Sequence, residues 1–432
     1  MSEPQDSVSD RMREDWNRRA REDAHYYVAF GGRDQDEAGF DATAADVLTN
    51  LEAELKRLPA NANRRAWRAL EIGCGPGRLM KPLSSRFGEI HGVDVSDEMI
   101  ALARERLRGI PHAHVHATGG ASLALFADES FDFVYTYAVF QHIPSRDVVL
   151  EYMREIRRVL RPGGIFRGQF NGLETRYAPT TWSGVSFSGD EIHAYTRENG
   201  LQLLALDGVR TQYMWTTWRK PGNPLPTAPG MPARIFRITH AYTREPAVPN
   251  RGRHAVIAVL MKGLPAGCDL NTLEVLVDGA AATPCYIGPP AADGLQQINA
   301  WLPKQIRTGL LPMELRSNGQ PLCAPAILRV IPAPPMVPRI ISITDGVNLV
   351  QQNRSTTGLL KVQLEEVSEP ESIGASVDGQ PISQVEVLCI DPRAPRYEVN
   401  LRLPEGLPAG WHTLELRVAS HRLLPAGIET TS

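Results

Sequence analysis

Proline is distributed unevenly along the 432-residue chain. Eight of its 34 prolines lie in residues 1–220, and the other 26 lie in the 212 residues that follow. The density rises abruptly in residues 221–232, where closely spaced prolines forbid a helix and favour an extended linker. The chain is therefore predicted to divide there, into a part that can form helices and a part built largely without them.

In residues 1–220, short apolar runs alternate with amphipathic helical patterns. Strands are expected at 69–72, 89–93, 131–135 and 164–170, with a closing pair within 201–218. Helices are expected at 43–57, 78–87, 97–108, 147–160 and 189–200. Strands that alternate with helices form a mostly parallel sheet with helices on both faces, so this part is predicted to be α/β.

Residues 233–430 show the short alternating apolar runs and the Asp-Gly and proline turns of all-β proteins. They also contain an internal repeat. The tripeptide Val-Asp-Gly at 277–279 recurs at 377–379, and Glu-Leu-Arg at 314–316 recurs at 415–417. The offset is 100 or 101 residues, which indicates two copies of one structural unit.

The repeat length sets the expected domains of this half. One immunoglobulin-like sandwich has about 100 residues, so two such sandwiches are predicted, at 233–332 and 337–430. Residues 294–303 and 397–404 resemble bacterial immunoglobulin-like repeat modules. This resemblance implies a fold and leaves the function open, because such sandwiches serve many purposes.

Charge, hydropathy and cysteine content narrow the class of protein. The formal net charge of −3 excludes a chain-wide basic surface for nucleic acid. The longest apolar run, 255–261, is far shorter than the roughly 20 residues that span a membrane. Residues 1–15 are polar and acidic, without the apolar core of an export signal. Five cysteines without C-x-x-C spacing indicate reduced thiols, with a disulfide among the last four left open. We therefore expect a cytoplasmic protein with neither a membrane nor a nucleic-acid partner.

The stretch most informative about chemistry follows the strand at 69–72. It carries Glu71 and then three glycines, Gly73, Gly75 and Gly77, before a helix begins. Glycines allow a sharp turn and let backbone N–H groups approach a ligand closely. Asp94 ends the next strand, 23 residues after Glu71, where a carboxylate can accept hydrogen bonds from both hydroxyls of a ribose. The pattern predicts a cofactor that contains a nucleoside.

Position 78 separates two cofactor classes. A dinucleotide fingerprint G-x-G-x-x-G would need glycine there, and the residue is Arg78. The region instead resembles the class I S-adenosylmethionine-dependent methyltransferases of type 11 or 12, over about residues 12–218. The motifs that carry the resemblance lie at 70–78, 92–96, 130–135 with 141–143, and 159–164. It implies S-adenosylmethionine as the cofactor and a Rossmann-like domain with a mostly parallel seven-stranded sheet, with lid helices within residues 8–60.

The resemblance also implies a role for each matching position. The loop 73–77 would contact the methionine part, Glu71 would orient it, and Asp94 would bind the ribose. Tyr137 would lie near the sulfonium. The complete set of expected cofactor contacts is Glu71, Gly73, Cys74, Gly75, Gly77, Arg78, Asp94, Val95, Met99, Ala121, Ser122 and Tyr137.

Adenine recognition departs from the family pattern. Many relatives carry an acidic residue that binds the adenine amino group, and Gly120 occupies the aligned position here. Backbone groups or Ser122 would then read the base, and Val95 or Met99 would pack on it.

His142 is the leading candidate for a general base. A neutral imidazole can remove a proton from a methyl acceptor near pH 7. The alternative is that His142 caps or packs the helix that follows the fourth strand.

The acceptor pocket is expected to involve aromatic side chains from two segments. Trp16, Tyr26 and Tyr27 lie on the N-terminal lid, where they either bind ligand or simply pack the helix. Tyr177 and Trp182 lie in the inserted segment 171–188 and are expected to line the pocket.

No metal site is expected. His112, His114 and His116 alternate along one strand and face the same way, but the segment has no carboxylate or cysteine to join them.

Two functions from different classes follow. The first is methyl transfer from S-adenosylmethionine to a small-molecule or glycan acceptor, with the C-terminal sandwiches serving docking, homo-oligomer assembly or a protein partner. The second is a non-catalytic protein that binds S-adenosylmethionine and whose immunoglobulin-like domains bind a protein or carbohydrate.

Overall fold

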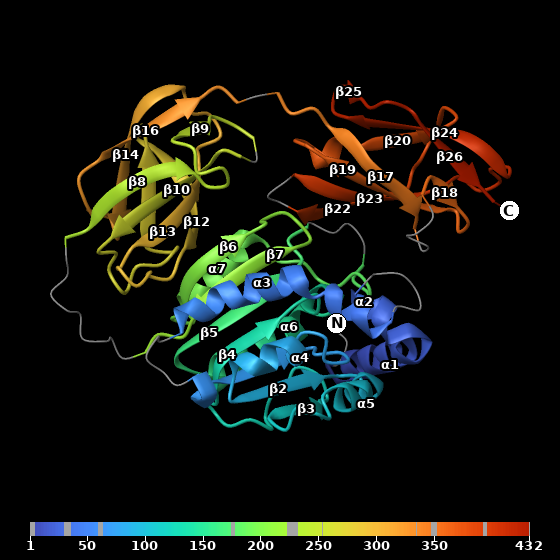
Figure 1. The fold of residues 1–432 in the computed structure, drawn as a ribbon, viewed down its shortest axis with the longest axis horizontal. Coiled ribbons are helices and arrows are strands. Elements are labelled where there is room, and N and C mark those ends of the chain that lie inside the picture. The colour runs from blue at the N-terminus through green and yellow to red at the C-terminus, as the bar shows by residue number, and fades with distance from the viewer. Residues whose placement is uncertain are drawn as a thin grey trace.

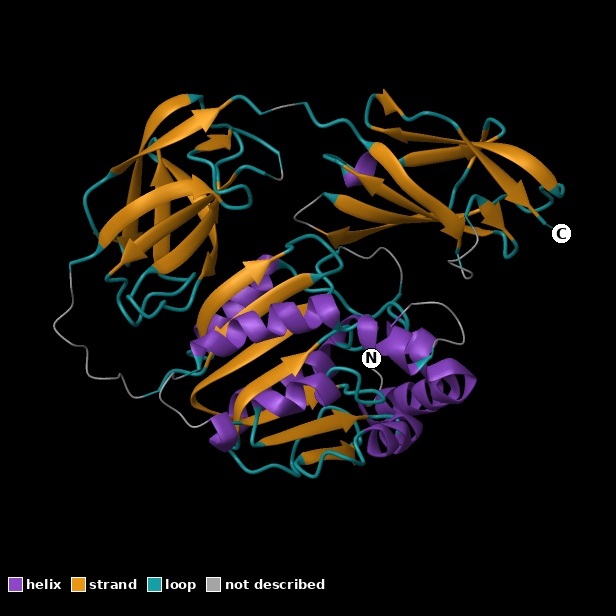
Figure 2. Cartoon of the chain, viewed as in Figure 1, coloured by secondary structure: helices purple, strands orange, loops and turns teal. Residues whose placement is uncertain are grey.

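The computed structural model describes residues 5–29, 36–58, 64–173, 178–222, 232–252, 254–333, 335–346, 352–391 and 395–431. Within these ranges the chain forms an N-terminal α/β part followed by two β-sandwiches (Figures 1 and 2). The predicted linker at 221–232 falls largely on residues 223–231, which lie outside the described ranges.

Seven strands form the sheet of the N-terminal part. They are β1 (Arg68–Ile72), β2 (Glu89–Asp94), β3 (Ala113–Ala117), β4 (Phe131–Thr136), β5 (Leu160–Phe170), β6 (Gln202–Asp207) and β7 (Met214–Arg219). Their order is β3-β2-β1-β4-β5-β7-β6. The first five pair in parallel, and β7 is antiparallel to both β5 and β6. Parallel strands end on the same side, so the C-terminal ends of β1, β2 and β4 meet at one edge of the sheet.

Helices surround this sheet, on both of its faces and at the edge where its parallel strands end (Figure 2). They are α1 (Gln5–Ala29), α2 (Glu37–Ala42), α3 (Ala45–Glu54), α4 (Met80–Leu83), α5 (Asp97–Arg106), α6 (Arg146–Val159) and α7 (Gly189–Glu198), with 3-10 turns at Leu55–Arg57, Arg64–Ala66, Ser84–Arg86 and Phe140–His142. The helix predicted at 78–87 is shorter than expected. The hydroxyls of Ser84 and Ser85 donate to the carbonyls of Lys81 and Pro82, and such bonds compete with helical ones.

Helix α1 lies across the edge of the sheet where β1 and β2 end. The Asn17 side-chain oxygen accepts hydrogen bonds from the Ser96 hydroxyl at 2.7 Å and from the Glu98 backbone N–H at 3.2 Å. The helix is broken at Asp23, whose φ of −169° and ψ of 90° are not helical. The Asp23 carboxylate accepts from the backbone N–H of Tyr26 at 3.0 Å and restarts the helix.

The first sandwich continues the N-terminal sheet. Its strands are β8 (Arg234–His240), β9 (Ala247–Pro249), β10 (Val256–Lys262), β11 (Leu273–Val277), β12 (Ala280–Ile287), β13 (Gln296–Trp301), β14 (Gly309–Ser317), β15 (Gln320–Pro321) and β16 (Ala326–Ile331). Strand β12 pairs with β6 through Tyr286 and Ala205, which joins both parts in one 16-stranded sheet. The expected seven strands are therefore present, and they continue into the strands of the first sandwich. Pairing with β12 protects β6, which would otherwise be an open edge strand.

The hydrophobic core also crosses this junction. One contiguous cluster of buried side chains contains Phe166 and Trp218 of the N-terminal part together with Val259 and Leu315 of the first sandwich. The backbone N–H of Leu270 donates to the Leu203 carbonyl at 2.8 Å, in the same region. The N-terminal part and the first sandwich therefore form one packed body.

The second sandwich has a core of its own. Its strands are β17 (Arg339–Asp345), β18 (Arg354–Ser355), β19 (Leu359–Glu365), β20 (Gly374–Val377), β21 (Gln380–Pro381), β22 (Val385–Asp391), β23 (Arg396–Arg402), β24 (Gly410–Val418), β25 (His421–Arg422) and β26 (Ala426–Thr430), with a 3-10 turn at Pro370–Ser372. One sheet has the order β17-β19-β23-β22, and the other is built on β18-β26-β24-β20-β21. The buried side chains between them form a cluster separate from the core of the rest.

The internal repeat occupies the same turn in both sandwiches. Asp278 and Gly279 connect β11 to β12 with φ values of 51° and 79°, and Asp378 and Gly379 connect β20 to β21 with 48° and 77°. Two successive positive φ values make a tight hairpin turn, which explains why Asp-Gly is present at both places.

None of the described helices has both the length and the apolar content needed to cross a membrane. All five cysteines lie in the described ranges and are free thiols.

Candidate functional site

The loop between β1 and α4 is a turn of three glycines. Gly73, Gly75 and Gly77 have φ values of 68°, 51° and 82°, in the left-handed region that favours glycine. A Cβ atom on Gly73 would lie 2.3 Å from a methyl carbon of Val139, in the loop after β4. Gly73 and Gly75 line a cavity, whereas Gly77 is not among the described residues that line it and faces Leu107 of α5. The predicted contact between Gly77 and the cofactor stays a prediction.

Asp94 ends β2 and holds the glycine loop. Its Oδ2 accepts from the backbone N–H of Gly75 at 2.9 Å, and its Oδ1 accepts from that of Ser96 at 2.9 Å. Burial raises the pKa of Asp94, and these two backbone donors act in the opposite direction. The carboxylate lines the cavity, and its two oxygens have more lone pairs than backbone donors, which leaves acceptor capacity for a ligand hydroxyl.

Glu71 lies deeper in the same cavity and is only 4% exposed. The hydroxyl of Tyr135 donates to its Oε2 at 2.8 Å. Burial raises the pKa of Glu71 to about 8, against the influence of the Tyr135 hydroxyl and the charge of Arg78. A positively charged ligand would favour the ionised form, so this buried carboxyl group suits a cofactor with an ammonium and a sulfonium group.

Arg78, Tyr137 and Cys74 form the wall beside the glycine loop. The Arg78 guanidinium donates to the backbone and side-chain oxygens of Thr43 at 3.0 and 3.2 Å, which ties the loop to the turn between α2 and α3. It lies 5.8 Å from the ring centre of Tyr137. Burial raises the pKa of the Cys74 thiol well above its ordinary value, so this side chain is an unreactive part of the wall.

Two of the predicted adenine contacts lie in the cavity. Val95 and Met99 line it, together with Met12 of α1 and Tyr152 of α6. The sequence pattern did not single out Met12 or Tyr152. Tyr152 had the helical spacing of a core residue, and nothing in one sequence says that a buried helix face borders a cavity.

Ala121 and Ser122 are two further residues that were predicted to contact the cofactor. Ala121 and Ser122 are not among the described residues that line the cavity; Ala121 is buried elsewhere and Ser122 is exposed. Helix α1 packs directly on their loop, since a Cβ atom on Gly120 would lie 2.3 Å from the Ser9 hydroxyl oxygen. The Tyr152 hydroxyl donates to the Gly120 carbonyl at 2.8 Å from the other side.

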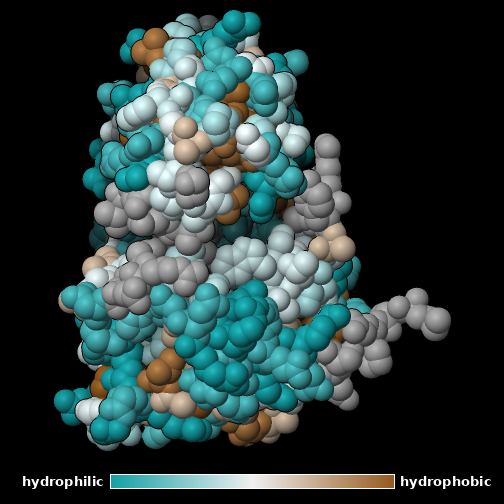
Figure 3. All heavy atoms as spheres, turned by 90° about the vertical axis from the view of Figure 1, so that its right-hand side faces the viewer, coloured by the Kyte–Doolittle hydropathy of each residue, from teal (hydrophilic) through white to brown (hydrophobic). Residues whose placement is uncertain are grey.

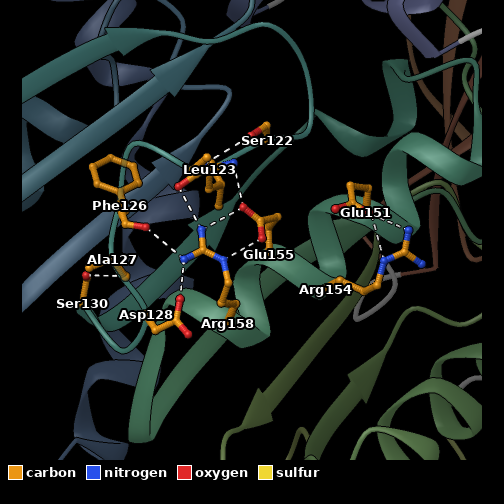
Figure 4. Close-up of polar contacts among 11 residues, drawn as sticks. Ser122, Leu123, Phe126, Ala127, Asp128, Ser130, Glu151, Arg154, Glu155 and Arg158 are labelled. Atoms are coloured by element: carbon orange, nitrogen blue, oxygen red, sulfur yellow. Dashed lines mark hydrogen bonds and ion pairs between the residues drawn. The ribbon is translucent and has the colours of Figure 1, made fainter.

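The same loop is fixed to α6 by Arg158 (Figure 4). The guanidinium donates to the carbonyls of Leu123 and Phe126 at 3.0 and 2.9 Å and pairs with Asp128 at 2.8 Å. The Glu155 carboxylate binds both the guanidinium and the Leu123 backbone N–H. Arg158 therefore stabilises the loop after β3 and is not a free surface cation.

His142 also lines the cavity and belongs to a directional chain of hydrogen bonds. Gln169 donates to the Gln141 side-chain oxygen at 3.0 Å, which leaves the Gln141 amide group facing His142 Nε2 at 3.2 Å. His142 Nδ1 lies 2.7 Å from the Trp182 carbonyl and must donate to it, so Nε2 is the acceptor. Burial lowers the pKa of His142 to about 4. The ring is neutral at pH 7, but it is a weak base whose lone pair is already used, which favours the packing alternative.

Aromatic side chains surround His142. Trp16 contacts its ring edge to face at a centroid distance of 5.5 Å, and Trp182 lies at 5.3 Å. The Arg19 guanidinium lies between them, 4.6 Å from the Trp16 ring and 4.8 Å from the Trp182 ring. Tyr27 approaches Trp182 edge to face at 6.2 Å. The predicted lid and the inserted segment therefore meet at His142.

The lid is also held by polar contacts. Arg19 donates to the Thr181 carbonyl at 3.1 Å and pairs with Asp15 at 2.7 Å. Tyr26 is buried and packs edge to face on Tyr27 at 5.2 Å. Tyr177, which was also predicted to line the pocket, lies outside the described residues.

The glycine loop at Gly73 and Gly75, the two carboxyl groups of Glu71 and Asp94, and the aromatic cluster around His142 line one cavity of about 1680 Å³. Pockets for single small molecules are about 300–1,000 Å³, so this cavity has room for a cofactor and an acceptor together. Gln212 and Tyr213, between β6 and β7, line it as well. So do residues of β19, β22 and β23 in the second sandwich, which no sequence pattern indicated.

A separate group of potential metal ligands lies on β2 and β3. Ligand atoms of Glu89, His91 and His114 lie within 4.8 Å of one another. Residues 112–116 contain no carboxylate, but the pairing of β2 with β3 brings Glu89 next to these histidines. The Arg68 guanidinium binds Glu89 at 2.6 Å and lies 3.2 Å from His91, so a cation already occupies this position.

Residues 70–167 match the family of methyltransferase domains. The match contains the glycine loop, Asp94, Tyr137 and His142. It confirms the resemblance to the class I S-adenosylmethionine-dependent methyltransferases over these residues, and S-adenosylmethionine is the cofactor of that class. The match does not extend to residues 233–430, whose immunoglobulin-like character stays a prediction.

Curated relatives and solved structures add to this comparison. The methyltransferase GfsG of Streptomyces halstedii is 31% identical over 185 residues, which are 40% of this chain and 64% of that protein. The chain thus spans less than two thirds of that relative. The 27-O-demethylrifamycin SV methyltransferase of Amycolatopsis mediterranei is 29% identical over 194 residues, 41% of this chain and 69% of that protein. The structure of geranyl diphosphate C-methyltransferase from Streptomyces coelicolor superimposes with a TM-score of 0.37 and 15% identity, covering 50% of this chain and all of that one.

Proposed function

We propose that this chain, whose residues 70–167 match the methyltransferase domain family, transfers a methyl group from S-adenosylmethionine to a small-molecule or glycan acceptor. One observation carries the proposal. The glycine loop, Asp94 and the buried Glu71 line the same cavity as the aromatic cluster of Trp16, Tyr27 and Trp182. A cofactor-binding edge and an acceptor pocket are thereby in contact.

The residues at the sheet edge would hold the cofactor. Asp94 would accept from the ribose hydroxyls, Glu71 would face the cationic methionine part, and Val95 and Met99 would pack on adenine. Bound S-adenosylmethionine supplies a methyl group on a positively charged sulfur, and its displacement by a nucleophilic acceptor atom leaves S-adenosylhomocysteine. The lid of α1, fixed by Arg19, would exclude water from the reacting atoms.

Most of the proposed rate acceleration comes from positioning the acceptor against the cofactor. An in-line displacement gains its rate mainly from holding the reactants close and aligned. His142, with a pKa lowered by burial to about 4, orients the Trp182 segment instead of removing a proton. The two sandwiches would serve docking or assembly, and the protein would work in the cytoplasm.

Calorimetry with an Asp94→Ala variant tests the proposal. We expect wild type to bind S-adenosylmethionine and Asp94→Ala to bind it at least tenfold more weakly, because two hydrogen bonds to the ribose and the loop anchor are lost. Asp97→Ala is the matched control, since Asp97 is exposed and does not line the cavity. Equal affinities in all three proteins would contradict the proposed cofactor site.

A turnover assay separates the enzyme from a non-catalytic binding protein. Wild type is incubated with S-adenosylmethionine and a bacterial metabolite extract, and S-adenosylhomocysteine is measured by mass spectrometry. We expect product above the level of Asp94→Ala. Tight binding with no product from any extract fraction would favour the binding protein.

A further inference from the structure

One face of the four-stranded sheet in the second sandwich is polar. Along β19, Leu360, Val362 and Leu364 point into the sandwich core, so the alternate residues Lys361 and Gln363 point to the opposite face. Strand β23 pairs with β19 and places Asn400 opposite Lys361 and Glu398 opposite Gln363. Strand β22 adds Glu386 opposite Asn400. We call Lys361, Gln363, Glu386, Glu398 and Asn400 the polar face.

The polar face borders the cavity that contains the proposed cofactor site. We call Gly73, Gly75 and Asp94 the cofactor edge. All five residues of the polar face line that cavity, as do Glu71, Asp94 and His142. In Figure 1, β22 and β23 lie on the side of the second sandwich that faces the N-terminal part, and Figure 3 shows these two lobes one above the other. Tyr213 is near enough to Glu398 for that charge to add to burial in raising its pKa. The polar face is therefore a wall of the proposed active site.

The chemistry of the polar face indicates the kind of molecule it contacts. Lys361 pairs with Glu398 at 3.1 Å, and the two side chains are only 13% and 16% exposed. The Asn400 amide donates to Glu386 at 3.1 Å. These groups include both donors and acceptors, which hydroxyl groups can satisfy because a hydroxyl both donates and accepts. An apolar ligand could not use the donor and acceptor positions that these two pairs leave free, and covering them would cost free energy.

We propose that the polar face binds the hydroxyl-rich part of the methyl acceptor, such as a sugar, while another part of the acceptor reaches the cofactor edge. The inference rests on the proposed methyltransferase function and adds the class of acceptor and a second binding surface. With Lys361 against Glu386 and Glu398, the polar face carries a formal charge of −1, which disfavours a strongly anionic ligand and is compatible with an uncharged saccharide. The cavity volume of about 1680 Å³ suits an acceptor that extends between both walls.

The experiment uses the full chain, wild type and a Lys361→Ala, Glu398→Ala double variant, which removes one charge of each sign. The control is Glu415→Gln, an exposed position on the other sheet of the same sandwich that does not line the cavity. Each protein is saturated with S-adenosylhomocysteine and incubated with the neutral carbohydrate fraction of a bacterial extract. Retained compounds are identified by ultrafiltration and mass spectrometry, with the apolar fraction as the comparison probe.

We expect wild type and Glu415→Gln to retain a hydroxyl-rich compound, and the double variant to retain at least tenfold less of it with unchanged affinity for S-adenosylhomocysteine. Retention of apolar compounds only, equal retention by all three proteins, or no retention by wild type would overturn the inference. If wild type does not bind S-adenosylhomocysteine, the proposed function is contradicted instead. The difference in carbohydrate retention between wild type and the double variant would still test the polar face.

Discussion

Gly73 combines a φ of 68° with a neighbour, Val139, that a Cβ atom would meet at 2.3 Å. In Gly73→Ala the left-handed backbone costs about 1–2 kcal/mol. Crowding against Val139 adds about 1–3 kcal/mol. We predict a lower free energy of unfolding, measured in urea, and weaker binding of S-adenosylmethionine.

Gly279→Ala is the control for this prediction. Gly279 has a φ of 79° and no atom within 4 Å of its Cβ position, so only the backbone cost applies. Equal losses of stability in both variants would show that the close approach to Val139 has no consequence.

Glu71 makes the stability of the ligand-free protein depend on pH. Its pKa in the folded state is raised by burial to about 8, above its ordinary value of 4.5. Between these values the unfolded chain releases a proton that the folded protein keeps, so rising pH favours unfolding. Glu71→Gln does not titrate, and its free energy of unfolding should exceed that of wild type by a margin that grows by about 1.4 kcal/mol per pH unit. Urea unfolding at pH 5, 6.5 and 8 measures the margin, and a constant margin would contradict a raised pKa.

A substitution of His142 tests whether this residue is a general base or a positioning residue. Removing a general base typically lowers the rate by about 10²–10⁴-fold. Because the pKa of His142 is lowered to about 4 and Nε2 already accepts from Gln141, we predict that His142→Asn loses less than about tenfold in kcat. The Asn amide can still donate to the Trp182 carbonyl. A plot of the wild-type kcat against pH should show no inflection near pH 6.5. A hundredfold lower kcat in the variant would support His142 as the general base.

At the scale of secondary-structure elements, the turn after α3 joins the first sandwich to the N-terminal part. Arg57 is 1% exposed, forms an ion pair with Glu54, and donates to the Ile287 carbonyl of β12 at 2.6 Å. Burial would raise the pKa of Glu54, but Arg57 and Arg167 outweigh it and keep that carboxyl group ionised. A contact between distant segments thus depends on one buried ion pair.

We predict that Arg57→Ala lowers the free energy of unfolding by about 3–5 kcal/mol, because Glu54 stays buried without its partner. The Glu54→Gln, Arg57→Met double variant should lose less, since it removes both charges of the pair and leaves no carboxylate facing a missing partner. Urea unfolding followed by tryptophan fluorescence compares them. If the double variant is as unstable as Arg57→Ala, the loss comes from packing rather than from an unpaired carboxylate.

At the scale of the whole molecule, the described residues contain a core that spans the N-terminal part and the first sandwich, and a separate core in the second sandwich. Leu315 and Leu416 occupy equivalent positions of the repeat, and they are 1% and 2% exposed. They offer a matched pair for testing which parts unfold together.

We predict two calorimetric transitions, with S-adenosylhomocysteine raising the midpoint of the one that includes the cofactor edge. Leu315→Ala should destabilise that transition by about 2–5 kcal/mol, and Leu416→Ala should destabilise the other by a similar amount. If Leu416→Ala lowers the midpoint of the ligand-sensitive transition as much as Leu315→Ala does, the two cores are coupled.

Local pattern alone indicated much of this architecture. The glycine turn, Asp94 and the alternating strands of the first half depend on backbone geometry and on periodicity, which neighbouring residues determine. The Asp-Gly turns at 278 and 378 likewise follow from two successive positive φ values. The alternation correctly indicated β1, β2, β4 and β5, and the helix at 78–87 was too long because serine hydroxyls compete locally.

The sequence by itself therefore determined the cofactor class and the order of strands and helices, because these depend on residues close together in the chain. Only the tertiary structure decided that β6 pairs with β12, that α1 covers the loop of Ala121 and Ser122, and that the second sandwich borders the cavity at the glycine loop. These features arise from contacts between segments separated by tens to hundreds of residues, and such contacts leave no periodic signal in a single sequence.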